Sequence, residues 1–212
     1  MRELVRLQVG AAVLRVGVVD SPEEQEACER LRFRSYALDL HQVAERDFPD
    51  GRETDRYDPH SVHLIGVLSQ PGSADEVVGT VRGIDTRFGC LVEGAQFSGT
   101  TFRWPPSLDR ARTIEVSRLI GHTKRLSSGG AIRVWQVMFH ALLRWCREND
   151  QSTWIFAGIS GAVDQLVSWE WPVEILIPGK HVYHDSVVQL GRLPVPPTEE
   201  AMYRIEHTVS RV

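Results

Sequence analysis

The chain has 212 residues, of which 42% are apolar and 25% are charged, and its formal net charge is −4. This is the balance of a globular protein with a real core, and the small net charge does not indicate a polyanionic partner. The sequence contains no nucleic-acid-binding motif and no run of about 18 apolar residues, so neither nucleic-acid binding nor a membrane span is expected. The scattered Cys28, Cys90 and Cys146 form no disulfide or zinc pattern and favour a reduced, cytoplasmic setting.

The first residues predict a strand followed by a helix. Residues from about Ala12 to Val19 read as a strand, and Arg15 interrupts the apolar stretch that a signal peptide would need. The run from Asp20 to Glu24 has a capping serine, then proline and acidic residues, which is a helix-start signal. We expect this helix to continue to about Leu40.

The next segment, from about His41 to Ser61, is polar and rich in turn residues, and it is too long for a plain connector. It contains the carboxylates Glu53, Asp55 and Asp58. By composition alone these could form a solvated acidic loop, a cation site or a recess for a substrate ammonium. His60 and His63 keep a metal site open as an alternative, but their spacing matches no metal motif and no metal is expected.

Two antiparallel strands are predicted next, over Val62–Leu68 and Val77–Ile84. Arg82 interrupts the second strand, and a buried arginine needs a partner, either Asp85 or the carboxylates of the preceding loop. Residues 85–112 read as a loop with at most a short helix, and their scattered aromatic side chains are candidates for covering a pocket.

The stretch from Ile114 to Trp135 is the centre of the sequence. It begins as an apolar strand, crosses a polar segment to Gly129-Gly130, and enters a run with apolar residues at helical spacing. A strand, a glycine-containing loop and a helix point backbone N–H groups and a helix N-terminus at an anion, usually a phosphate. Glu115, Ser117 and Arg118 on the strand would place reactive groups beside it. This arrangement predicts an enzyme that uses a phosphate-bearing acyl donor.

Further elements are predicted over Thr153–Ile159 (strand), Gly161–Trp169 (helix), Val173–Ile177 and Tyr183–Leu190 (strands), and from Thr198 onward (helix). This order predicts an α/β fold with a mixed, mostly antiparallel sheet, helices on both faces, and one parallel crossover at the central stretch. We expect residues 1–212 to form a single domain.

Four short patterns follow one another in the chain: Arg32 and Tyr36 as R-x-x-x-F/Y, Glu53, Asp55 and Asp58 as E-x-D-x-x-D, Arg82 after V-x-G, and Glu115-Val116-Ser117-Arg118 as E-x-S-R. Together they resemble the acyl-homoserine-lactone autoinducer synthases, a branch of the GNAT-type N-acyltransferases. The segment ERDFPDGRETDRYDPHSVHLIG is similar to that of acyltransferases associated with PEP-CTERM/exosortase systems, and N-acyl amino acid synthases are a third relative. The resemblance implies a GNAT-like three-layer α/β/α sandwich. It also implies an acyl donor on phosphopantetheine, carried by acyl carrier protein or coenzyme A, with no tightly bound cofactor.

Two positions depart from these families. The autoinducer synthases carry a tryptophan six residues after the aromatic, where it helps to form the S-adenosylmethionine site, and this chain has Gln42 there. The GNAT phosphate loop, R/Q-x-x-G-x-G/A, is matched by Arg125–Gly130 at its last position but not at Ser128. Because a single pantetheine phosphate needs a smaller cradle than the pyrophosphate of coenzyme A, this loop favours a carrier-protein donor.

The resemblance assigns roles to individual residues. The catalytic candidates are Glu115, Ser117 and Arg118, with Glu115 receiving the amine proton and backbone N–H groups from Ser117 to Leu119 facing the oxyanion. The acceptor-binding candidates are Arg32, Tyr36, Glu53, Asp55, Asp58 and Arg82. The donor phosphopantetheine candidates are Lys124, Arg125, Gly129 and Gly130. The acyl-pocket candidates are Met138, Phe139, Leu142, Trp154 and Phe156, for most of which core packing is the alternative.

Several alternatives stay open. Glu115 and Arg118 could form a purely structural pair, because a neighbouring guanidinium makes a carboxylate a weaker base. If the acceptor has a carboxylate, Arg82 or Arg118 could bind it bidentately. Basic residues around the central stretch could contact an acidic carrier protein or simply be solvated.

The leading hypothesis is an N-acyltransferase that moves a fatty acyl group to the amine of an amino acid or similar small acceptor. The alternatives are a homoserine-lactone synthase that uses S-adenosylmethionine, and a non-catalytic module of GNAT shape that binds acyl carrier protein or a small ligand.

Overall fold

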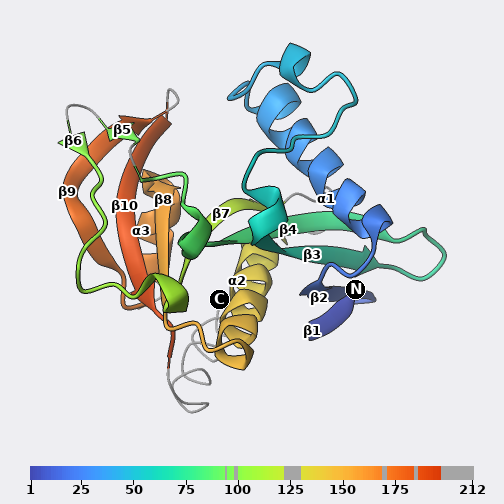
Figure 1. The fold of residues 1–212 in the computed structure, drawn as a ribbon. Helices are drawn as coiled ribbons and strands as arrows, with labels where there is room; N and C mark the ends of the chain where they lie inside the picture. The colour runs from blue at the N-terminus through green and yellow to red at the C-terminus, as the bar shows by residue number, and fades with distance from the viewer. Residues whose placement is uncertain (94, 98–99, 122–129, 169–170, 184–185, 197–212) are drawn as a thin grey trace. The chain divides into compact units, whose positions relative to one another are not determined.

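The computed structural model describes residues 1–93, 95–97, 100–121, 130–168, 171–183 and 186–196 (Figure 1). The chain divides into two compact units. The first unit contains Met1–Gly83 and Arg118–Trp145, and the second contains Ile84–Ser117 and Cys146–Val212. The expectation of a single domain over residues 1–212 stays a prediction.

The sheet of the first unit has the strand order β1-β2-β3-β4-β7. These strands are β1 (Arg2–Val9), β2 (Ala12–Val18), β3 (Ser61–Ser69), β4 (Glu76–Asp85) and β7 (Thr113–Gly121), the last of which continues from the second unit. The predictions of β2, β3, β4 and β7 are confirmed. Strand β1 was not predicted, because its pairing with β2 shifts register between Glu3 and Val5, and this irregularity breaks the alternation that marks a strand.

Helix α1 (Pro22–Phe33) begins where the sequence predicts. The side-chain oxygen of Ser21 accepts a hydrogen bond from the backbone N–H of Glu24 at 3.3 Å, and Pro22 occupies the first turn, where its missing N–H costs nothing. The chain then continues as a π-helix over Arg34–Asp39, so the predicted end near Leu40 is confirmed. The wider π-helical turn was not predicted. Such turns occur often at functional sites.

Helices α1 and α2 (Gly130–Glu148) cover opposite faces of β3 and β4 (Figure 1). A Cβ atom on Gly79 would lie 2.8 Å from Cγ1 of Val134, and one on Gly66 would lie 3.0 Å from Sδ of Met138, so these glycines let α2 approach the sheet closely. Successive side chains of a strand point to opposite faces. Arg82 therefore points away from α2, and it shares its carboxylate partner Asp58 with Arg32 of α1. The first unit thus has the expected α/β/α layering.

The second unit has the strand order β7-β8-β10-β9. Strand β8 (Thr153–Ile159) is parallel to β7, as the predicted crossover requires, and β10 (Ser186–Pro194) is antiparallel to both β8 and β9 (Glu174–Tyr183). The predicted bounds of the last two strands were wrong. Strand β9 continues through Pro178 and Gly179, which has a φ of +97°, so these two residues make an irregularity within a strand and do not end it.

In the second unit, helix α3 (Ser160–Ser168) packs on strand β8, where its Val163 lies against the backbone at Gly158. The segment from residue 86 to 112 forms two 3₁₀ turns, Thr86–Phe88 and Arg110–Arg112, and the short strands β5 (Gln96–Phe97) and β6 (Thr100–Thr101). Phe97 and Phe102 of this segment are buried in a core cluster, whereas Phe88 is exposed. These two aromatic side chains therefore fill a core, which the sequence did not predict. The final helix expected from Thr198 lies outside the described residues.

In the described part of the chain, no helix is both long enough and apolar enough to span a membrane.

Candidate functional site

Six charged side chains of the first unit form one connected set of ion pairs, which we call the charge network. They come from α1, from the loop that follows it, from β4 and from β7. The members are Arg32, Glu53, Asp55, Asp58, Arg82 and Arg118. The three cations and three anions balance, as burial of charged groups in a protein requires.

Arg32 lies at the centre of the network and its side chain is fully buried. Its Nε donates to Oε2 of Glu53 at 2.5 Å, and its two Nη atoms donate to the two carboxylate oxygens of Asp58 at 2.9 and 3.0 Å. Burial by itself would lower the pKa of Arg32, but the bonds and charges of Asp58 and Glu53 raise it above its usual value. Arg32 therefore remains charged in the interior.

Arg82 is the second fully buried cation. It makes a bidentate contact with Asp55 at 2.8 and 2.9 Å and a further bond to Oδ1 of Asp58 at 2.7 Å. Its partners are thus the carboxylates of the upstream loop, one of the two predicted options, while Asp85 accepts bonds from Arg87. Burial alone would raise the pKa of Asp58, but hydrogen bonds from Arg32 and the charges of Arg32 and Arg82 hold it well below its usual range.

Arg118 closes the network from strand β7. Its Nε and Nη2 lie 3.0 and 2.7 Å from Oε1 of Glu53, and Nη2 lies 3.2 Å from Oδ2 of Asp55. The guanidinium sits over the ring of Tyr36, 5.4 Å from its centroid. The backbone of Arg118 has a φ of +54°, a left-handed conformation that costs a non-glycine residue energy and that its side-chain contacts offset.

Solvent reaches the network mainly at one pair of opposite charges. The side chains of Arg32, Arg82 and Glu53 are 0%, 0% and 2% exposed, whereas those of Asp55 and Arg118 are each 21% exposed. This carboxylate and guanidinium lie 3.2 Å apart at the edge of the network, where a charged small molecule can reach them. The carboxylates of the acidic loop are thus paired with arginines and do not form a freely solvated acidic surface.

The loop around the network is fixed by its own carboxylates. Asp55 accepts from the backbone N–H of Tyr57 at 2.8 Å, and Asp58 accepts from the backbone N–H of Asp55 at 2.8 Å. His63 on β3 places Nε2 3.3 Å from the carbonyl oxygen of Asp58. Burial lowers the pKa of His63, so the ring is neutral and braces this turn. Sequence reasoning considered His63 only as a metal ligand.

Glu115 and Ser117 lie on the part of β7 that belongs to the second unit. The carboxylate of Glu115 is buried and accepts a hydrogen bond from the backbone N–H of Leu91, which ties down the segment after β4. Ser117 is half-buried. Arg118 pairs with the carboxylates of Glu53 and Asp55. These contacts differ from the structural Glu115–Arg118 pair that the sequence left open as an alternative. The role of Glu115 as a base stays a prediction.

The predicted donor loop is mostly outside the described residues, which exclude Lys124, Arg125 and Gly129. Gly130 is the first residue of α2. The strand and helix predicted on either side of this loop are confirmed, and the role of the four residues in phosphopantetheine binding stays a prediction.

The five predicted acyl-pocket residues are buried. Met138, Phe139 and Leu142 lie on α2 in the first unit. In the second unit, Trp154 donates from Nε1 to Sγ of Cys146 at 3.2 Å, and Phe156 packs against the backbone at Gly191. These contacts are core packing, and an acyl-binding role stays a prediction.

Across the residues that the structure describes, no group of three or more His, Cys, Asp or Glu side chains is arranged to hold a metal ion.

A family profile described as "Acetyltransferase (GNAT) domain" matches residues 31–136. Solved structures of the same fold include the coenzyme-A-dependent acyl-homoserine lactone synthase MesI, with 20% identity, coverage of 92% of this chain and 95% of MesI, and a TM-score of 0.63. BjaI, another such synthase, solved with SAM and isopentyl-CoA, has 16% identity, coverage of 89% and 82%, and a TM-score of 0.62.

TofI, solved in a ternary complex with an inhibitor and MTA, has 15% identity, coverage of 90% and 96%, and a TM-score of 0.66. A comparison with curated protein sequences found no match. The profile match spans half of the chain and includes every member of the charge network. The chain therefore belongs to the family of GNAT acetyltransferase domains and is an acyltransferase.

Proposed function

We propose that this protein is an N-acyltransferase that moves a fatty acyl group from a phosphopantetheine thioester to the amine of an amino acid or a similar small acceptor. The observation that carries the proposal is the charge network, with its partly exposed Asp55 at the edge of a fixed set of ion pairs. The donor in this proposal is an acyl carrier protein or acyl coenzyme A.

Asp55 suits the ammonium group of the acceptor. Burial alone would raise the pKa of Asp55, but the hydrogen bonds and charge of Arg82 hold it below its usual value, so the group remains an anion. Its two oxygens are already oriented by Arg82 and by the backbone N–H of Tyr57. A ligand ammonium would therefore meet a carboxylate that loses little freedom on binding.

The proposed reaction needs the acceptor amine as a free base. Glu115 is the candidate that receives the proton, directly or through water. The amine nitrogen then attacks the thioester carbonyl carbon, an N–C bond forms, the C–S bond breaks, and the pantetheine thiol leaves with a proton. Backbone N–H groups from Ser117 to Leu119 are the proposed donors to the oxyanion.

The family match supports acyl transfer in general, and the structural neighbours support a thioester donor by analogy of fold, since BjaI was solved with isopentyl-CoA. A homoserine-lactone synthase is the competing enzyme, and BjaI was also solved with SAM. Gln42 stands where the autoinducer synthases have a tryptophan of the S-adenosylmethionine site, and this favours a different acceptor.

Mass spectrometry of the intact carrier protein and of small-molecule products tests the proposal. Purified protein is mixed with a long-chain acyl carrier protein, a pool of amino acids and S-adenosylmethionine, and the reaction is repeated with acyl coenzyme A. We expect loss of the donor acyl group and appearance of an N-acyl amino acid. A homoserine lactone product would assign the competing enzyme, and an intact donor in both reactions would indicate a non-catalytic binding module.

A further inference from the structure

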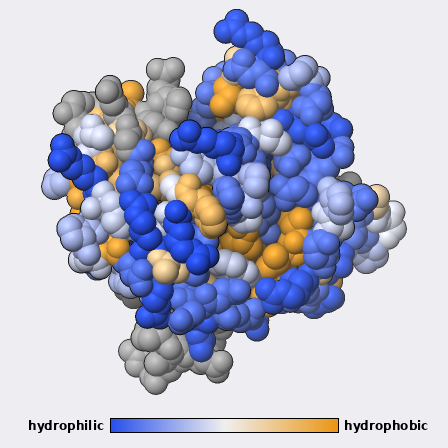
Figure 2. All heavy atoms as spheres, viewed as in Figure 1, coloured by the Kyte–Doolittle hydropathy of each residue, from blue (hydrophilic) through white to orange (hydrophobic). Residues whose placement is uncertain are grey.

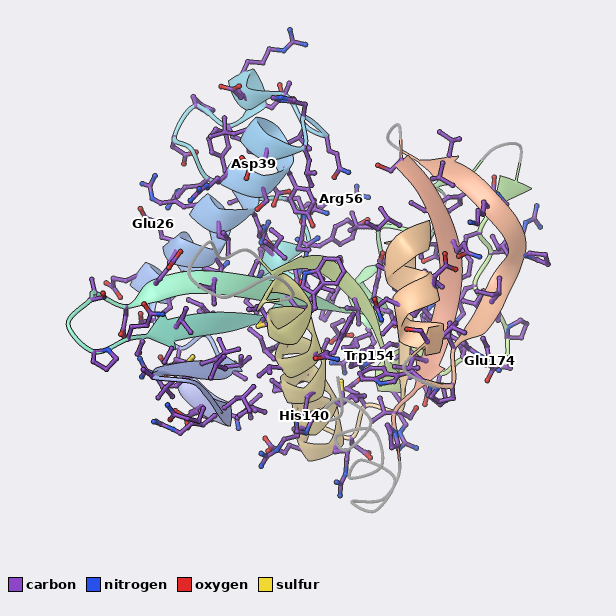
Figure 3. All side chains as sticks on the ribbon, turned by 180° about the vertical axis from the view of Figure 1, so that it is seen from behind. Glu26, Asp39, Arg56, His140, Trp154 and Glu174 are labelled. Atoms are coloured by element: carbon purple, nitrogen blue, oxygen red, sulfur yellow. The ribbon has the colours of Figure 1, made fainter. Side chains whose placement is uncertain are left out.

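Arg56 is a cation that the charge network does not use. It lies between Asp55 and Asp58 in the loop, it is exposed, and it is labelled in Figure 3, on the opposite side of α1 from Glu26 in that view. Among the described residues, no carboxylate forms an ion pair with Arg56. By contrast, each of Arg32, Arg82 and Arg118 is bound to two carboxylates.

Although it is exposed, Arg56 is held in place. Its Cζ atom lies 4.9 Å from the centroid of the Tyr57 ring, and its Nη2 donates to the Tyr57 hydroxyl at 2.7 Å. Tyr57 is itself buried, and its backbone N–H is bonded to Asp55. An exposed arginine normally loses side-chain entropy when it binds a ligand, and this bracing has already removed part of that cost.

We propose that Arg56 binds the carboxylate of the acceptor, so that the acceptor is an amino acid or another amine that bears a carboxylate. This inference rests on the proposed function. In an α-amino acid the ammonium and the carboxylate are separated by two bonds to one carbon, and the adjacent residues Asp55 and Arg56 offer the complementary pair of charges. The guanidinium presents a planar set of donors that matches a carboxylate.

The two other candidates for binding the acceptor carboxylate, Arg82 and Arg118, are already held by carboxylates of the protein. Arg82 is fully buried and spends its bonds on Asp55 and Asp58. Arg118 retains its bonds to the buried Glu53 even when a ligand ammonium takes over Asp55. The hydrogen bond to Tyr57 and, more weakly, the charge of Asp55 raise the pKa of Arg56, so it stays charged.

The test compares acceptors with and without the carboxylate in three forms of the full chain: wild type, Arg56→Gln and Arg46→Gln. Arg46 is the matched control, because it is an arginine of the same loop region whose side chain is 89% exposed. The probes are the L-amino acids and their α-carboxamides, with the acyl donor at a saturating concentration. Steady-state kinetics then give kcat and KM for each acceptor, and Arg56→Lys shows whether charge alone restores recognition.

We expect the wild type to prefer the amino acid over its carboxamide. In Arg56→Gln the KM for the amino acid should rise about tenfold, since a charge-assisted bidentate contact is lost, while the KM for the carboxamide and both kcat values stay within about twofold. Arg46→Gln should behave as wild type, and Arg56→Lys should recover part of the loss. An unchanged preference in Arg56→Gln would overturn the inference.

The inference and the proposed function fail in different ways. If the wild type acylates amines but ignores the carboxylate, the inference is wrong and the proposed function stands. If the wild type acylates no amine, the proposed function fails, and calorimetric titration with the same amino acids decides the inference. Weaker binding to Arg56→Gln than to Arg46→Gln would then support it, and equal or absent binding would overturn it.

Discussion

Glu53 Oε1 lies 2.7 Å from Arg118 Nη2, although the two residues are 65 positions apart in the chain. The same carboxylate binds Arg32 through its other oxygen, so Glu53 links the end of α1 to strand β7 within the first unit. It is 2% exposed and lies between two cations. One buried anion thus supports both sides of the candidate acceptor site.

Glu53→Gln should be strongly destabilising. The substitution preserves shape but leaves Arg32 and Arg118 without one of their counter-charges, and removing one partner of a buried ion pair costs about 3–5 kcal/mol. Urea denaturation at about pH 7 measures the free energy of unfolding. Glu45→Gln, in an exposed turn of the same loop region, is the control and should unfold like wild type. Equal midpoints for the two variants would show that Glu53 does not have this structural role.

Gly79→Ala should destabilise the first unit because of its close contact with α2. The added Cβ would lie 2.8 Å from Cγ1 of Val134 and 3.2 Å from the backbone oxygen of Ile120, and overpacking of this kind costs about 1–3 kcal/mol. The matched control is Gly161→Ala in α3, where nothing lies within 4 Å and alanine favours a helix. The midpoint temperature of thermal unfolding should fall for Gly79→Ala and should stay equal or rise for Gly161→Ala. The opposite order of midpoints would contradict this packing.

Acid should weaken the fold through Asp55 and Asp58. Both carboxyl groups have folded-state pKa values below their usual value, so their stabilisation is fully present above the unfolded pKa of about 3.9 and is lost as the pH falls through the folded values. The free energy of unfolding of wild type should therefore fall below about pH 5.

Asp58→Asn removes one of these two groups and should give a flatter pH dependence in the same acid range. Urea denaturation repeated across that range compares the slopes. Parallel curves for wild type and Asp58→Asn would contradict the lowered pKa of Asp58.

The three thiols should be inert in the folded protein. Cys28, Cys90 and Cys146 are buried thiols that form no disulfide, and burial raises the pKa of each to about 12. Because the thiolate is the reactive form, iodoacetamide should label none of them in the native state and all of them in denaturant. Mass spectrometry of the labelled chain reports both results, and rapid native labelling of any one cysteine would contradict its burial.

The sequence singles out every member of the charge network, because each stands in a short pattern with a fixed spacing. Arg32, Asp58 and Arg118 are distant along the chain, and only the family resemblance relates them before the fold is known. Because a buried cation requires an anion, the sequence predicts a carboxylate partner for Arg82, and the loop carboxylates that bind it are one of the two options left open. The long loop between α1 and β3 was expected to be functional from its length.

Other features depend on tertiary contacts that no local pattern reveals. Strand β1 is irregular in register, and Pro178 with Gly179 looks like a strand end although β9 continues past it. Arg56 and Tyr57 occupy variable positions of E-x-D-x-x-D, so the pattern itself does not mark them, and their stacking appears only in the structure. The surface over α1 is mainly hydrophilic in Figure 2, and this composition does not distinguish Arg56 from other exposed arginines.

The central claim is that Asp55, at the exposed edge of the charge network, binds the acceptor amine. Its most direct test is the KM for the amine in Asp55→Asn, measured beside Asp50→Asn, whose aspartate is 54% exposed and pairs with Arg52 in the same loop. Circular dichroism confirms folding of each variant, and Asp55→Glu provides a second variant that keeps the charge. We predict a rise in KM of at least about tenfold for Asp55→Asn, partial recovery in Asp55→Glu and no change in Asp50→Asn. A folded Asp55→Asn enzyme with the wild-type KM would contradict the account.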